Sequence, residues 1–129
     1  MKGGIASSLQ VRLLSFRYAI EGIGYALRTQ HNTWIHFTAT VTAFLIAWLL
    51  GLPGIEWALL VLTVSLVWVA ELINTALEAV VDLSAPDYHP LAKAAKDVAA
   101  GAVLVAAIGA VLVGFFLFGP PFWALVIGS

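Results

Sequence analysis

The sequence predicts an all-α membrane protein, with an amphipathic surface helix followed by three transmembrane helices. The 129-residue chain is 62% hydrophobic and only 10% charged, whereas soluble domains carry about 25% charged residues. It also contains three apolar stretches that are each long enough to cross a hydrocarbon layer of about 30 Å. We expect these elements to form a single membrane domain over residues 1–129, without a separate soluble domain.

The first expected element covers about residues 7–30 and is amphipathic. Its apolar residues recur at alternating spacings of four and three, which is the period of one helix face. They are Leu9, Leu13, Phe16, Ile20, Ile23 and Leu27. Arg17, Glu21 and Arg28 share a neighbouring face. The pattern favours a helix lying on the cytoplasmic surface of the membrane, and a helix packed against the other helices is the alternative.

The three expected transmembrane helices cover about residues 33–50, 55–81 and 92–118. Short connections rich in Gly and Pro separate them, and Pro53 and Pro90 suit the first turns of helices. A polar face on the second of these helices needs partners to shield it from lipid, so we expect oligomerisation.

The basic residues predict how the helices are oriented in the cell membrane. All six precede the first span or lie at the second connection, and none lies at the first connection or in the C-terminal tail. They are Lys2, Arg12, Arg17, Arg28, Lys93 and Lys96. Because basic residues favour the cytoplasmic side, we expect the N-terminus and the second connection to be cytoplasmic and the C-terminus to be outside.

Several kinds of site are excluded by composition and motif. The chain has no cysteine, which excludes disulfides, cysteine-based zinc or iron–sulfur sites and a thiol nucleophile. It also lacks the phosphate-binding loop GxxxxGK[ST], the dinucleotide motif GxGxxG, the kinase triplets HRD and DFG, and the zinc motif HExxH. Any phosphoryl transfer therefore uses a different scaffold, and we expect no nucleic-acid partner.

Four polar residues form a row on the second transmembrane helix. Glu71, Asn74, Glu78 and Asp82 recur at i, i+3, i+7 and i+11, which places them within an arc of about 80° on one face. Carboxylates in or beside a bilayer are costly, so such a row predicts a functional site. A packing role would explain one such residue more readily than four.

The depth of this row predicts chemistry at the inner membrane boundary. Counted from Ile55, Glu71 lies about 24 Å along the helix, while Glu78 and Asp82 lie about 35 and 40 Å along it. One face therefore passes from an apolar to an aqueous environment. A reaction between a lipid and a water-soluble reactant needs that arrangement.

Charged residues at the start of the third transmembrane helix extend the predicted site. Lys96 and Asp97 lie just across a short connection from the row, whereas Lys93 is interpreted as a headgroup contact. Carboxylates hold Mg²⁺, which brings nucleotide phosphates with it, and a lysine offsets charge on phosphoryl oxygens. This cluster favours a phosphate and magnesium site.

These motifs resemble a known family. The segment Glu71-Leu-Ile-Asn-Thr-Ala-Leu-Glu78-Ala-Val-Val-Asp82, followed by His89 and by Ala95-Lys96-Asp97, resembles the signature of the small prokaryotic integral-membrane diacylglycerol kinases and undecaprenol kinases. The segment Arg28-Thr-Gln-His-Asn-Thr-Trp-Ile-His36 is similar to the family's sequence ahead of its first span. The resemblance extends from about Phe16 to Phe118.

The resemblance implies an assembly and an activity. Members of that family are homotrimers with active sites between subunits on the cytoplasmic side. They transfer the γ-phosphoryl group of Mg-ATP to a lipid hydroxyl. On this basis the chain is expected to be a lipid kinase that uses Mg²⁺ as cofactor, ATP as co-substrate and diacylglycerol or undecaprenol as acceptor.

The resemblance also implies residue roles. Glu71 would be the general base beside the lipid hydroxyl, Ala100 would join it at the lipid site, and Glu78 would be a metal ligand. The residues expected to surround the nucleotide and its phosphates are Tyr18, Asn74, Asp82, Asp87, Tyr88, His89, Lys96 and Asp97. One position departs from the family, where a second metal ligand is commonly Glu but this chain has Gln30. A neutral amide oxygen is a weaker Mg²⁺ ligand than a carboxylate.

Other functions are left open by the residues. A small oligomeric proton-coupled transporter would also use glutamates within the membrane, but near the midplane and without need of Lys96 and Asp97. A non-catalytic assembly factor would give no reason for the row.

His31 and His36 are interpreted as headgroup contacts. The Arg-Thr-x-x-Asn pattern followed by His36 favours the undecaprenol branch, but the choice of lipid stays open.

Overall fold

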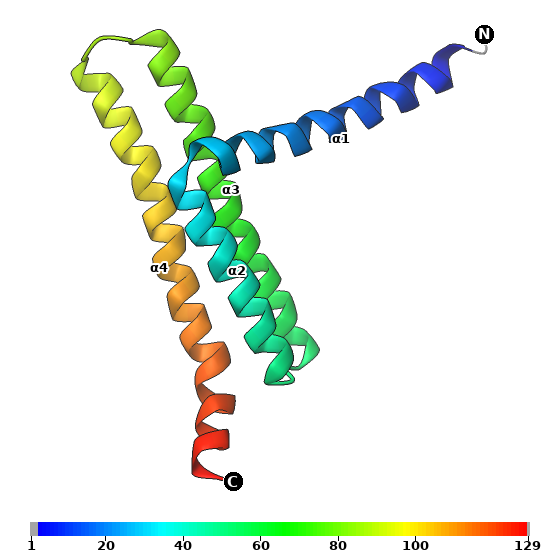
Figure 1. Cartoon of the computed structure of the whole chain (residues 1–129), viewed down its shortest axis with the longest axis vertical. Coiled ribbons are helices and arrows are strands. Elements are labelled where there is room, and N and C mark those ends of the chain that lie inside the picture. Colours follow the sequence, from blue (N-terminus) through cyan, green and yellow to red (C-terminus); the bar gives the residue numbers. More distant parts are fainter. Residues whose placement is uncertain (1–2, 129) are drawn as a thin grey trace.

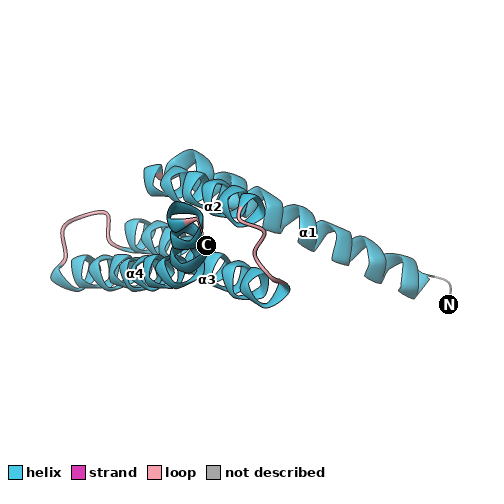
Figure 2. Cartoon of the chain, turned by 90° about the horizontal axis from the view of Figure 1, so that it is seen from below, coloured by secondary structure: helices cyan, strands magenta, loops and turns pink. Residues whose placement is uncertain are grey.

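The computed structural model describes residues 3–128 of the chain. It contains four helices: α1 (Gly3–Thr29), α2 (His31–Leu49), α3 (Gly54–Ser84) and α4 (Pro90–Ile127). Short loops join them, and no strand occurs among the described residues (Figure 2). The all-helical fold predicted from the sequence is confirmed.

The helices extend beyond several of the expected bounds. α1 begins at Gly3 rather than near residue 7, and α3 continues to Ser84, so that Asp82 is helical. α4 runs to Ile127 rather than ending near residue 118, and it includes Pro120 and Pro121. A proline removes an N–H donor but retains a helical φ, so these two residues remove hydrogen bonds from the helix without ending it.

Three of the helices lie side by side, and the fourth does not (Figure 1). α2, α3 and α4 form the bundle, in which α3 and α4 make the most extensive contact. α1 leaves this bundle at a large angle. Its junction with α2 lies part-way along α3, so the ends of α3 and α4 and the loop between them project beyond that junction.

The α2–α3 connection is a tight turn at the end of α3 opposite the α3–α4 loop. Gly51 has a φ of 64°, in the left-handed region that favours glycine. Its N–H donates to the carbonyl of Trp48 at 3.2 Å, and the N–H of Leu52 donates to the carbonyl of Ala47 at 3.1 Å. This hydrogen-bond pair is the Schellman arrangement that ends a helix. The small apolar core beside it consists of Ala47, Leu52, Leu60 and Leu117.

Large apolar side chains are exposed along all four helices, and the buried core is small. Among the described residues, α3 and α4 are each long and apolar enough to cross a membrane. α2 does not meet that criterion, because polar residues such as Thr33, His36 and Thr40 interrupt it. The fold is that of a helical membrane protein, while the third span, the surface location of α1 and the trimer remain predictions.

Candidate active site

A polar pocket of about 270 Å³ lies between the start of α2 and the facing sides of α3 and α4. It is the place where the predicted row of α3 meets the other helices. Its lining residues are Gln30, Asn32, Ile35, His36, Glu71, Asn74, Glu78, Ala100, Val103, Leu104 and Ala107. Four residues with predicted site roles besides Glu71 therefore line one pocket.

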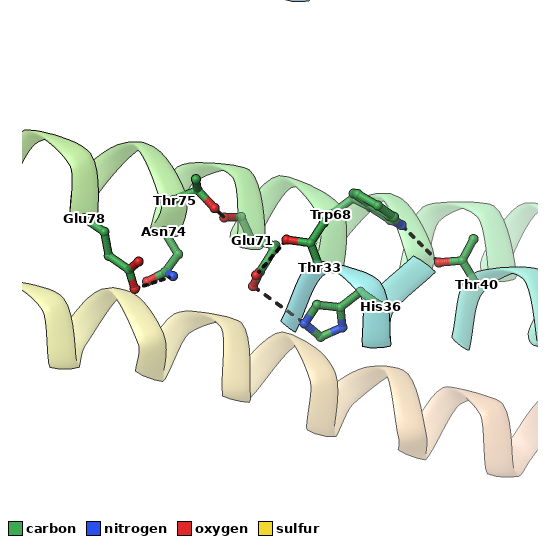
Figure 3. Close-up of polar contacts among 8 residues, drawn as sticks. All are labelled: Thr33, His36, Thr40, Trp68, Glu71, Asn74, Thr75 and Glu78. Atoms are coloured by element: carbon green, nitrogen blue, oxygen red, sulfur yellow. Dashed lines mark hydrogen bonds and ion pairs between the residues drawn. The ribbon is translucent and has the colours of Figure 1, made fainter. Parts of the chain in front are cut away.

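Glu71 is the buried acid of this pocket, with only 1% of its surface exposed. Thr33 donates a hydrogen bond from Oγ1 to Oε1 of Glu71 at 3.3 Å. The other carboxylate oxygen, Oε2, lies 3.6 Å from Nε2 of His36. Figure 3 shows Glu71 reaching from α3 toward these two residues of α2. The carboxylate is thus fixed through one oxygen, while the second oxygen faces a histidine.

Glu78 lies nearer the α3–α4 loop and is half-buried. Gln30 donates from Nε2 to Oε2 of Glu78 at 2.6 Å, and Asn74 donates from Nδ2 to Oε1 at 3.0 Å. The amide oxygen of Asn74 is buried without a hydrogen-bond partner. Since buried polar atoms normally have partners, this oxygen is available to a ligand.

The row on α3 passes from buried to exposed side chains along one face. Glu71 and Asn74 are buried, Glu78 is half-buried and Asp82 is exposed. Figure 3 shows the first three pointing from α3 toward α2 and α4. At the exposed end, Asp82 pairs with Lys96 of α4. This ion pair brings opposite charges of α3 and α4 together at the exposed end of the row.

Five other predicted site residues lie outside the polar pocket. Tyr18 is exposed on α1, about 18 Å along the helix from Gln30. Asp87 and Tyr88 are exposed in the α3–α4 loop. His89 caps α4, since its Nδ1 accepts a hydrogen bond from the N–H of Leu91 at 3.2 Å. Asp97 is exposed and pairs with Lys93 on its own helix. Their roles toward a nucleotide remain predictions.

The donor atoms around Glu78 suit a hard cation. They are the two carboxylate oxygens of Glu78 and the unpartnered Oδ1 of Asn74, while Gln30 and Asn74 turn their amide nitrogens toward the carboxylate. Among the described residues, no three His, Asp or Glu side chains converge as a metal site. Mg²⁺ commonly binds through one or two carboxylates, substrate phosphates and water. The pocket therefore fits Mg²⁺ that arrives with a nucleotide, with Glu78 as its protein carboxylate.

Sequence reasoning missed a polar face on α2. Thr33 and His36 contact Glu71, and Thr40 accepts a hydrogen bond from Nε1 of Trp68 at 3.0 Å. The interpretation of His36 as a headgroup contact is replaced by this contact with Glu71. The spacing of Thr33, His36 and Thr40 at i, i+3 and i+7 in an apolar helix is the signal that could have revealed the face.

An apolar pocket of about 320 Å³ adjoins the polar one. Both pockets are lined by Ile35, His36 and Ala107, so His36 and the neighbouring Glu71 lie at the boundary between them. The apolar pocket continues along α2, α3 and α4 toward Gly114 and Phe118. The arrangement can hold a polar group at Glu71 with an attached apolar chain beyond it.

The chain is similar to several known proteins. The family model described as prokaryotic diacylglycerol kinase matches residues 17–118. A diacylglycerol kinase of Synechocystis sp. is 53% identical over 116 residues, covering 89% of this chain and 66% of that protein. An undecaprenol kinase of Bacillus subtilis is 42% identical over 82% of this chain and 86% of its own length. A diacylglycerol kinase of Escherichia coli K12 is 36% identical over 75% of this chain and 85% of its own length.

Proposed function

The chain belongs to the prokaryotic diacylglycerol kinase family, and we propose that it transfers the γ-phosphoryl group of Mg-ATP to the hydroxyl of a membrane lipid. Relatives are named diacylglycerol kinase and undecaprenol kinase, so lipid kinase is the activity class that the family supports. The acceptor is a long-chain alcohol of one of these two kinds.

One observation supports this function most strongly. A single side of α3 leads from the buried carboxylate of Glu71, through Glu78, to the exposed pair of Asp82 and Lys96. A lipid hydroxyl has access to the apolar end, and a nucleotide has access to the exposed end. The two reactants can therefore meet within one polar pocket of about 270 Å³.

Glu71 is the general base of the proposed mechanism. The lipid hydroxyl lies at the boundary of the two pockets, where the apolar pocket accommodates the attached chain. Thr33 holds Oε1 of Glu71, which leaves Oε2 to accept the hydroxyl proton. The lipid oxygen forms a bond to the γ-phosphorus, while the bond to the β-phosphate oxygen breaks and ADP leaves. Such a transfer depends mainly on positioning and charge neutralisation.

The residues toward the loop serve the nucleotide. Mg²⁺, when bound with ATP, offsets charge on the β- and γ-phosphates. Glu78 would hold that ion, and Gln30 would add a weaker ligand through its amide oxygen, although its Nε2 faces Glu78 in this structure. Lys96 contacts the phosphates, and Asp82 orients the lysine through the ion pair of the two residues. Asn74 directs its unpartnered Oδ1 into the same region.

We place the cytoplasmic membrane surface near the α1–α2 junction. α1 leaves the bundle at this level, and the hydrogen bond from Gln30 to Glu78 ties the junction to α3 (Figure 1). With α1 lying on the surface, Glu71 is about 10 Å deeper than Glu78. The α3–α4 loop then lies in the cytoplasm, where Asp87, Tyr88 and His89 can approach ATP.

The remaining features of the proposal concern assembly and topology. α2 is a third span despite its polar face, because that face is turned toward Glu71 and Trp68 rather than toward lipid. The exposed apolar surfaces of α3 and α4 require lipid or other subunits as partners, and we propose a homotrimer. The proton-coupled transporter is not favoured, since the family is one of kinases.

Phosphorylation of lipid by the purified protein tests this function. The enzyme in detergent is mixed with radiolabelled Mg-ATP and with matched samples of diacylglycerol, undecaprenol and a long-chain alkane that lacks a hydroxyl. Label in the lipid fraction with either alcohol, and none with the alkane, is the expected result. No labelled lipid from any alcohol, in a sample that remains helical and monodisperse, would contradict the proposal.

A further inference from the structure

Glu71 is buried, so the proton that it takes from the lipid hydroxyl has no direct path to water. Each transfer to a lipid hydroxyl releases one proton, and the general base must lose it before the next turnover. The Glu71 side chain is only 2% exposed, so it has little direct contact with water. A neighbouring group with better access is therefore needed to remove the proton.

His36 is the neighbour that meets this need. Its Nε2 lies 3.6 Å from Oε2 of Glu71, and its side chain is 15% exposed. The imidazole also lines both the polar and the apolar pocket, at their boundary. It therefore touches the space in which the lipid hydroxyl must lie.

The two carboxylate oxygens of Glu71 have different partners. Oε1 accepts a hydrogen bond from Thr33 at 3.3 Å. Oε2 is 3.6 Å from the imidazole, which is beyond hydrogen-bond distance. For Nε2 to accept a proton from Glu71, the proton of the neutral imidazole must lie on Nδ1. Once Glu71 is protonated at Oε2, it becomes a donor and Nε2 its acceptor.

Among the described residues, the polar pocket is lined by one titratable group besides Glu71 and His36, and that group lies on α3. Glu78 also lines the pocket, about 10 Å along α3 from Glu71. The residues that α4 contributes to the pocket are all apolar: Ala100, Val103, Leu104 and Ala107. His36 is the one titratable residue of α2 that lines it.

We propose that His36 is a positioning residue that acts through Glu71 and removes the proton which Glu71 takes from the lipid. This inference rests on the proposed kinase function. The proton passes from the lipid oxygen to Oε2 of Glu71, then to Nε2 of His36, and the resulting imidazolium releases the proton on Nδ1 to water. Transfer of the remaining proton from Nε2 back to Nδ1 through water then restores the lone pair of Nε2 for the next turnover. Atoms and charge balance over the cycle, since ATP and the alcohol yield ADP, the phosphorylated lipid and one proton.

This role makes turnover sensitive to the charge of one histidine. Histidine is the side chain that ordinarily changes charge between about pH 5 and 8. A protonated His36 cannot accept a proton from Glu71, so turnover should fall once the pH is low enough to protonate the imidazole. A residue that only packs against Glu71 would not produce this dependence.

Substitution of His36 in the full-length enzyme tests the proposal. We expect His36→Gln to lower kcat by about tenfold, which is less than the full effect of a general acid or base. The KM values for lipid and for Mg-ATP should stay within about twofold of those of the unmodified enzyme. The acid limb that depends on histidine should disappear from its pH profile. Added imidazole should restore activity to His36→Ala, because it replaces the missing proton acceptor in the same space.

Matched controls separate this role from a structural one. Thr33→Ala should also lose activity, because Glu71 loses its hydrogen bond, but imidazole should not restore it. A wild-type-like kcat and pH profile for His36→Gln, or a His36→Ala variant that is folded yet unaffected by imidazole, would overturn the inference. Absence of lipid phosphorylation by the unmodified enzyme would instead overturn the proposed function.

Discussion

Gln30 donates a hydrogen bond from Nε2 to Oε2 of Glu78 at 2.6 Å, joining the α1–α2 junction to α3. The family resemblance implies a second carboxylate at the position of Gln30. Two facing carboxylates repel one another without a cation, whereas an amide and a carboxylate attract one another. The hydrogen bond therefore holds Glu78 in place, and the proposed metal site has one charged ligand fewer.

Gln30→Glu should strengthen the magnesium site. The second carboxylate adds a charged oxygen ligand, so half-maximal activity should need several-fold less Mg²⁺. Without Mg²⁺ the variant should melt at a lower temperature than the wild type, because the hydrogen bond is replaced by repulsion. A magnesium titration and thermal denaturation with and without the ion check both effects. An unchanged magnesium requirement would exclude Gln30 from the metal site.

Glu78→Ala should raise the concentration of Mg²⁺ required for activity by at least about tenfold, the scale reported for perturbing metal-site residues. The variant removes the pocket's proposed metal carboxylate and also the acceptor for Gln30 and Asn74. Glu56→Ala, at the first turn of α3, is the control. A magnesium titration identical to that of the wild type would remove Glu78 from metal binding.

Lys96→Met should weaken the use of ATP. Its ammonium group pairs with Asp82 and faces the proposed phosphate region, so KM for Mg-ATP should rise by about tenfold, the loss expected for a hydrogen bond to a charged group. Lys93→Met provides a matched control, because Lys93 pairs with Asp97 on an exposed part of the same helix. If the two variants have the same KM for Mg-ATP, Lys96 has no phosphate role.

Gly51→Ala should destabilise the α2–α3 connection without changing catalysis. Nothing lies within 4 Å of a Cβ added at Gly51, but its φ of 64° strains any other residue. We expect a loss of about 1 kcal/mol in stability. Gly54→Ala is the control, since it has the same open space without a positive φ. Equal unfolding midpoints for the two variants in a denaturing detergent would contradict the reasoning.

The sequence was sufficient to predict that the chain is helical and which residues of α3 share one face of the site. The spacing of Glu71, Asn74, Glu78 and Asp82 predicts a common helix face, because helical geometry alone decides it. The position of Lys96 near the row was expected because a short loop joins the two helices, and in the structure Lys96 pairs with Asp82. Local rules of this kind need no knowledge of packing.

The contacts between α2 and α3 could not be predicted in the same way. Which face of α2 meets Glu71 depends on the packing of two helices, so Thr33 and His36 were not identified as its partners. The rule that a proline ends a helix also failed for α4, which continues through Pro120 and Pro121. A proline ends most helices, but the helical backbone tolerates its φ when the lost hydrogen bonds can be accommodated.

The rate of phosphoryl transfer in Glu71→Gln tests the central claim most directly. Glutamine keeps the size of the side chain and can still accept from Thr33, but it cannot take a proton from a lipid hydroxyl. In a single-turnover experiment with saturating lipid and Mg-ATP, we expect the rate to fall by at least ~100-fold, with both substrates still bound. A rate close to that of the wild type would contradict the account and remove Glu71 from the chemistry.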